Sequence, residues 1–190
     1  MNETHRQFLA SPEWAKILET DLLPWILEAG DLGDDVLEIG PGPGLSTDLL
    51  RERVPHVTAV ELDDDLAVRL TERLAGTNVD VVHADGTASG LPSDRFSTAT
   101  CFSVLHHMPA PDLQDRLFAE VHRMLRPGGR FFGTDAVENE MIREFHVDDI
   151  FVPVDPKTLG YRLEAAGFAT THIAASEYEV RFTASKAGGS

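Results

Sequence analysis

The chain has 190 residues, enough for one domain with a substantial core and too few for two domains of ordinary size. It carries 16 basic and 32 acidic residues, a formal net charge of −16 at pH 7 with histidine neutral, which disfavours a nucleic acid substrate. Because Cys101 is the single cysteine and no apolar stretch approaches the length of a membrane span, we expect a cytoplasmic protein without disulfides that does not enter a membrane.

Residues 1–30 are expected to form a helical cap. Ser11 and Pro12 are typical of an N-cap and a first helical position. Apolar residues follow from Trp14 at helical spacing, and Pro24 allows either one kinked helix or two short ones. Packing against the domain explains the tryptophans more readily than contact with a substrate does.

A glycine-rich loop follows the first predicted strand. Residues 36–39 form a short run that is apolar except for Glu38, as in a buried parallel strand, and glycines follow at alternate positions: Gly40, Gly42 and Gly44. Glycine lets the backbone pass close to a ligand, and Ser46 or Thr47 could cap the next helix. A Gly-Pro turn with a purely structural role is the alternative.

The loop departs from two nucleotide-binding patterns. Leu45 stands where a dinucleotide fingerprint has its third glycine, and no lysine follows Gly44 as a phosphate-binding loop requires. The carboxylate of Glu38 would repel a pyrophosphate but would suit an ammonium or sulfonium group. We therefore expect a zwitterionic or cationic ligand.

Glu38 and these glycines resemble the E-x-G-x-G-x-G first motif of class I S-adenosylmethionine-dependent methyltransferases, and the resemblance extends from about residue 36 to the C-terminus. It implies S-adenosyl-L-methionine as the cofactor. The alternation of strands and helices predicts a doubly wound α/β sheet with helices on both faces. The resemblance adds that the sheet is mostly parallel and seven-stranded, with an antiparallel last strand.

Two further strand ends carry candidate cofactor residues. Glu61 ends the second predicted strand, where a carboxylate can accept hydrogen bonds from both ribose hydroxyls of any adenosine ligand. In the family the matching residue binds the ribose, and the next residue, here Leu62, packs on adenine. Asp85 and Gly86 follow the third strand, where the family binds the adenine amino group and ring edge. An ordinary Asp-Gly turn is the alternative there.

The segment after the fourth predicted strand carries the candidate catalytic residues. Ser103-Val104-Leu105-His106-His107 resembles a segment of the methyltransferases of ubiquinone and menaquinone biosynthesis, although Ser97 stands where those proteins usually have Asp. Ser103 is a candidate cofactor residue. His106 and His107 are the candidate general bases, and a structural role is an equal alternative for each. Asp135 and His146 are weaker candidates.

The opening motif also resembles ribosomal RNA adenine dimethylases. Those enzymes require an Asn-(Leu/Ile)-Pro-Tyr type motif after the fourth strand, and residues 103–106 cannot take that role. The acidic charge agrees with this exclusion. We therefore expect a small-molecule acceptor and no nucleic acid partner.

The C-terminal part begins with a helix over 111–125, an Arg-Pro-Gly-Gly turn and a strand over 130–134. The resemblance implies a substrate lid over 137–154. His146, Asp148 and Asp149 there are residue types of metal sites, but their spacing matches no metal template, so we expect surface charge and no metal.

A capped helix begins at Asp155, and a hairpin of strands over 170–175 and 179–185 completes the domain, which spans 31–186. A disordered tail is expected over 187–190.

The function expected is in-line transfer of a methyl group from S-adenosylmethionine to oxygen, nitrogen or carbon of a small molecule. A non-catalytic S-adenosylmethionine-binding sensor or partner subunit of the same fold is the alternative. A nicotinamide-dependent oxidoreductase is a third hypothesis, and Leu45 and Glu38 both count against it. The sequence predicts no particular oligomeric state.

Overall fold

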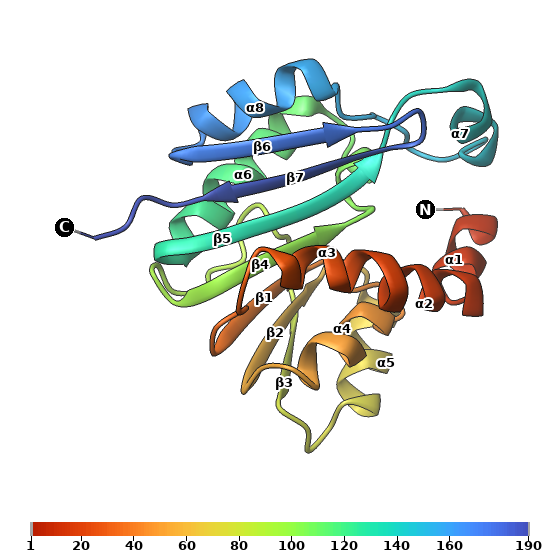
Figure 1. The fold of residues 1–190 in the computed structure, drawn as a ribbon. Helices are drawn as coiled ribbons and strands as arrows, with labels where there is room; N and C mark the ends of the chain where they lie inside the picture. Colours follow the sequence, from red (N-terminus) through yellow and green to blue (C-terminus); the bar gives the residue numbers. More distant parts are fainter. Residues whose placement is uncertain (1, 190) are drawn as a thin grey trace.

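The computed structural model describes residues 2–189, so Met1 of the predicted cap and Ser190 of the predicted tail lie outside the described residues. The described chain forms a seven-stranded sheet with the order β3-β2-β1-β4-β5-β7-β6 (Figure 1). Its strands are β1 (Asp35–Ile39), β2 (His56–Glu61), β3 (Val79–His83), β4 (Phe96–Phe102), β5 (Leu125–Ala136), β6 (Thr170–Ala175) and β7 (Glu179–Ser185).

The strand directions confirm the predicted fold class. Strands β1 to β5 pair in parallel, whereas β7 runs antiparallel to both β5 and β6. The bounds of the C-terminal hairpin, 170–175 and 179–185, are those expected from the sequence. The fold is therefore the mostly parallel, doubly wound sheet that the resemblance implied.

Helices cover both faces of the sheet. They are α1 (Glu3–Leu9), α2 (Pro12–Ile17), the π-helical segment η1 (Leu18–Leu22), α3 (Leu23–Glu28), α4 (Leu45–Arg51), α5 (Asp64–Arg73), the 3₁₀ turn η2 (Leu105–His107), α6 (Pro111–Met124), α7 (Glu140–Phe145) and α8 (Pro156–Ala165). Figure 1 shows α3 and α4 on the near face and α6 and α8 on the far face. Helices α1 and α7 lie beyond the carboxyl ends of the parallel strands.

Adjacent residues of β5 supply the cores on the two faces, because successive side chains of a strand point to opposite sides. Phe131 packs with Phe118 of α6 and Leu163 of α8. Phe132 belongs to the other core, together with Ile26 of α3. Burial on both faces explains why the central strands read as apolar runs rather than as alternating patterns.

Residues 12–28 are continuously helical, so this segment is one irregular helix rather than two short helices. The π-helical segment η1 joins α2 to α3 directly before Pro24. A proline in a regular helix lacks the backbone N–H and clashes with the preceding turn, and the wider π turn accommodates it. Ser11 is the N-cap, as expected, and its Oγ accepts a hydrogen bond from the Trp14 N–H at 3.2 Å.

Two local expectations are wrong. The N-cap of α4 is Gly44, in a left-handed conformation with φ 86°, and Ser46 and Thr47 lie inside the helix. The Arg-Pro-Gly-Gly stretch belongs to β5, whose pairing with β4 slips in register between Phe96 and Thr98. Gly128 has φ 79°, which lets the irregularity form within the strand.

Among the described residues, no helix combines the length and apolarity needed to cross a bilayer.

Gly133 of β5 is expected to be intolerant of a side chain. A Cβ at this position would overlap the ring of Phe182 in the core, whereas a Cβ at Gly160 of α8 would meet no atom closer than 3.7 Å. Gly133→Ala should therefore lower the free energy of unfolding by about 1–3 kcal/mol, and Gly160→Ala should raise it by about 0.5–1 kcal/mol. Urea unfolding measures both changes, and a Gly133→Ala variant as stable as wild type would contradict this packing.

Candidate active site

A cavity of about 350 Å³ opens at the carboxyl ends of β1 to β4. The glycine loop forms its floor, and residues 61–63, 84–87 and 102–104 form its walls. Arg6 and Leu9 of α1 and Trp14 of α2 cover it. Because the carboxyl ends of parallel strands meet at one edge, ligands of open α/β sheets bind in this position.

Glu61 connects the ends of the first two strands. Its buried carboxylate accepts hydrogen bonds from the Gly42 N–H at 3.0 Å and from the Asp63 N–H at 2.9 Å. Leu62 follows it, 67% exposed, in the wall of the cavity. Such an exposed apolar side chain beside a carboxylate suits a ligand that joins a ribose to a flat ring.

Asp85, Gly86 and Ser103 also line the cavity. Asp85 is exposed, and its Oδ1 accepts hydrogen bonds from the N–H and the hydroxyl of Thr87, each at 2.8 Å. Ser103 has φ 57° and donates its N–H to the Thr134 carbonyl at 2.8 Å. The sequence therefore named residues from three strand ends that the fold brings to one cavity.

The glycines of the loop divide into two roles. Gly40 and Gly42 line the cavity, and a Cβ at Gly42 would meet no atom within 4 Å, so this part of the loop faces open space. Gly44 is not among the lining residues, because a Cβ there would point at Leu70 and Arg73 of α5. Gly44 therefore permits close packing of α4 against α5.

Glu38 lies beneath the loop rather than in the cavity wall. Its buried carboxylate accepts hydrogen bonds from the hydroxyls of Ser46 and Thr47, the latter at 2.6 Å. Burial raises the pKa of Glu38 to about 7 and outweighs the opposite effect of the two hydrogen bonds. The residue thus joins β1 to the start of α4 and makes no contact with the cavity.

The two candidate bases differ in their access to the cavity. His107 lines the cavity. His106 is 1% exposed, and its Nδ1 donates a hydrogen bond to Oδ1 of Asp135 at 2.7 Å. Asp135 also accepts from the Leu105 N–H at 2.7 Å, so this carboxylate is buried beneath His106 and does not face a substrate.

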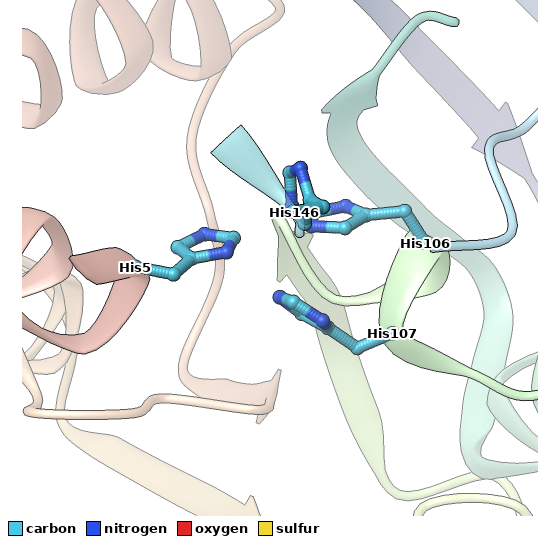
Figure 2. Close-up of side chains that lie close together, drawn as sticks. All are labelled: His5, His106, His107 and His146. Carbon is cyan, nitrogen blue, oxygen red and sulfur yellow. The ribbon is translucent and has the colours of Figure 1, made fainter. Parts of the chain in front are cut away.

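His106 and His107 belong to a cluster of imidazoles that the sequence analysis did not foresee. Figure 2 shows that the side chains of His5, His106, His107 and His146 point toward one another. Burial lowers the pKa of His5 to about 3 and that of His107 to about 4, and the neighbouring imidazoles add to both shifts. His5 and His107 are therefore neutral at pH 7.

The expectation of surface charge over 146–149 is wrong for two of its residues. His146 is 5% exposed and the Asp149 side chain 3% exposed, while Asp148 is exposed. The residue types at 146–149 indicated a candidate metal ligand at His146, but His5, which contacts it in the fold, lies 141 positions earlier in the sequence. Only the tertiary fold brings the two together.

The raised pKa of Glu38 predicts a pH-dependent stability. Because the folded protein holds a proton on Glu38 more tightly than the unfolded chain does, this contribution is complete below pH 4.5 and is lost as the pH rises through about 7. The free energy of unfolding of wild type relative to Glu38→Gln should fall by about 3 kcal/mol across this window. Urea unfolding at a series of pH values measures it, and a constant difference between the two proteins would refute the assignment.

Comparison with known proteins identifies a methyltransferase domain in the chain. Residues 36–129 match a family model described as a methyltransferase domain. A ubiquinone biosynthesis O-methyltransferase of Pseudomonas aeruginosa is 34% identical over 113 residues, which cover 57% of this chain and 47% of that protein. A probable ribosomal RNA small subunit methyltransferase A of Methanothermobacter thermautotrophicus is 33% identical over 147 residues, covering 67% and 51%. The chain thus spans about half the length of the curated relatives it matches.

The fold agrees with this match. A crystal structure of a protein from Pyrococcus horikoshii superimposes with a TM-score of 0.82 at 16% identity, over 98% of this chain and 99% of that one. The fit of the cavity to an adenosine ligand rests on Glu61, Leu62 and the open space at Gly42. Residues 36–129 therefore form a methyltransferase domain of the class I S-adenosylmethionine-dependent type, and the fold of the described chain agrees with it.

Proposed function

We propose that the chain catalyses methyl transfer from S-adenosylmethionine to a small-molecule acceptor. The cavity supports this proposal. The glycine loop and the strand ends that carry the candidate cofactor residues form its floor and walls, and apolar side chains of the N-terminal helices cover it. S-adenosylmethionine supplies a methyl group that is already activated by its sulfonium. The residues of the chain then have to hold the acceptor atom in line with the methyl group and the sulfur, and to exclude water from the cavity.

Three residues are proposed to hold the cofactor. Glu61 would accept hydrogen bonds from the ribose hydroxyls, as the position of its buried carboxylate at the end of β2 supports. Leu62 would pack against the adenine ring, and Asp85 would accept from its amino group. The exposure of both side chains in the cavity wall supports these roles.

The covering side of the cavity suits an acceptor with an apolar body. Leu9 and Trp14 lie on that side, and Met108 and Leu117 contribute further apolar surface. His107 adds a polar group to this lining. An acceptor held among these side chains would be shielded from water, which favours in-line transfer.

The charges around the cavity favour a small molecule over RNA. Among the described residues that line it, Arg6 is the one permanently cationic side chain, and it pairs with Asp63 at 3.2 Å. The lining carboxylates are Glu61, Asp63 and Asp85. Proteins that bind a phosphate backbone neutralise it with several lysine or arginine side chains, and this cavity offers no such surface.

Transfer of label from methyl-labelled S-adenosylmethionine tests the proposal. The purified protein is incubated with a low-molecular-weight metabolite extract and, separately, with ribosomal RNA. We expect labelled small molecules, unlabelled RNA and at least about tenfold less label with Glu61→Gln, which cannot accept as strongly from the ribose. Labelled RNA without labelled small molecules would overturn the acceptor class. Cofactor binding without any label would instead favour the non-catalytic alternative.

A further inference from the structure

We propose that His5, His106, His107 and His146 form a binding site for one divalent transition-metal ion of the zinc type. One candidate ligand nitrogen from each residue can be chosen so that all four lie within 4.8 Å of one another. Nitrogens around a tetrahedral zinc are about 3.4 Å apart, given Zn–N bonds of about 2.0–2.1 Å. Small side-chain rotations would therefore close the cluster around an ion.

The cluster contains buried nitrogens that have no hydrogen-bond partner among the described residues. These atoms are Nδ1 of His5, Nε2 of His106, both ring nitrogens of His107 and Nε2 of His146. Three of the four residues are at most 5% exposed. Buried polar atoms are normally paired, so several unpaired nitrogens turned toward one point indicate a ligand that completes them.

The surroundings of two rings fix which nitrogen faces inward. Nδ1 of His106 lies 2.7 Å from Oδ1 of Asp135, and Nδ1 of His146 lies 2.7 Å from the Ile142 carbonyl. An ionised carboxylate and a carbonyl can only accept, so each ring donates its Nδ1–H outward and keeps the Nε2 lone pair for the cluster. Ligand histidines of metal sites are oriented in this way.

The chemistry of the cluster selects the class of metal. Each residue of the cluster offers an imidazole nitrogen as its ligand atom. Four imidazoles without an oxygen ligand suit zinc, cobalt, nickel or copper and not magnesium or calcium. Asp135 and Asp149, whose Oδ2 lies 3.8 Å from Nδ1 of His107, provide negative charge beside the site.

The position of the site suggests what the ion does. His5 lies in α1, His106 and His107 lie in η2 after β4, and His146 ends α7. Existing hydrogen bonds already connect these parts, from the Asn2 N–H to Asp149 at 2.8 Å and from the Asn2 side chain to the Phe145 carbonyl at 3.1 Å. A bound ion would hold α1 and α7 over the cavity and would make His107 a ligand rather than a base.

Metal titration of the full chain tests the site. The protein is prepared without a polyhistidine tag, stripped with a chelator and titrated with Zn²⁺ by calorimetry and with Co²⁺ by visible absorption. We expect one equivalent per chain and the absorption bands of tetrahedral cobalt. Zn²⁺ at a hundredfold excess over its Kd should raise the melting temperature by about 5–10 °C.

Variants separate this site from adventitious binding. His146→Gln and His5→Gln should each weaken Zn²⁺ binding at least about 100-fold, and Asp135→Asn should weaken it about 10–100-fold through the orientation of His106. His172→Gln, at an exposed position of β6, is the matched control and should bind as wild type does.

The proposal is overturned if wild type binds no stoichiometric ion, or if His172→Gln weakens binding as much as His146→Gln does. Because His5 lies in a terminal helix, His5→Gln should keep a cooperative thermal transition and a wild-type circular dichroism spectrum. A folded His5→Gln chain with wild-type affinity would also overturn the four-histidine site. None of these readouts depends on methyl transfer.

Discussion

The cavity of this protein depends on a hydrogen-bonded connection between the ends of two central strands. β1 and β2 run in parallel and in register, so both end at the same edge, where the Gly40 N–H donates to the Val60 carbonyl at 2.9 Å. The buried carboxylate of Glu61 then accepts from the Gly42 N–H, which fixes the path of the glycine loop. Without this hydrogen bond, the loop would not be held in the path that leaves open space beside Gly42. The same carboxylate is the one proposed to bind the ribose, so one side chain would both shape the cavity and bind the ligand.

A second buried carboxylate organises the other end of the cavity. Asp135 is the last residue but one of β5 and accepts hydrogen bonds from the backbone of η2 and from the ring of His106. This interaction sets the start of the turn that carries His107 into the cavity wall, and it directs Nε2 of His106 toward His5 and His146. The cofactor half of the site is therefore built from local strand ends, whereas the covering half is assembled from α1, η2 and α7. A metal ion among the histidines would join these three elements at the one place where they all meet.

Local sequence patterns predicted the elements because each depends on neighbours in the chain. The apolar run of β1, the glycines after it and the carboxylate that ends β2 all have short-range signals, so the residues proposed to hold the cofactor could be named from the sequence. Glu38 was interpreted as a charge facing the ligand, but the start of α4 turns Ser46 and Thr47 onto it. The histidine cluster could not be predicted, because His5 and His146 lie 141 positions apart and only the tertiary fold places α1 beside α7.

We expect this cavity to bind an adenosyl sulfur ligand through Glu61 and Asp85. Isothermal titration of the purified chain with S-adenosylhomocysteine, S-adenosylmethionine and NAD tests it most directly, alongside Glu61→Gln, Asp85→Ala and the control Asp65→Ala at an exposed position of α5. We expect micromolar binding of both sulfur ligands, no binding of NAD, a loss of at least about tenfold in affinity for the first two variants and none for the control. Binding of NAD, or unchanged affinity in Glu61→Gln and Asp85→Ala, would contradict it.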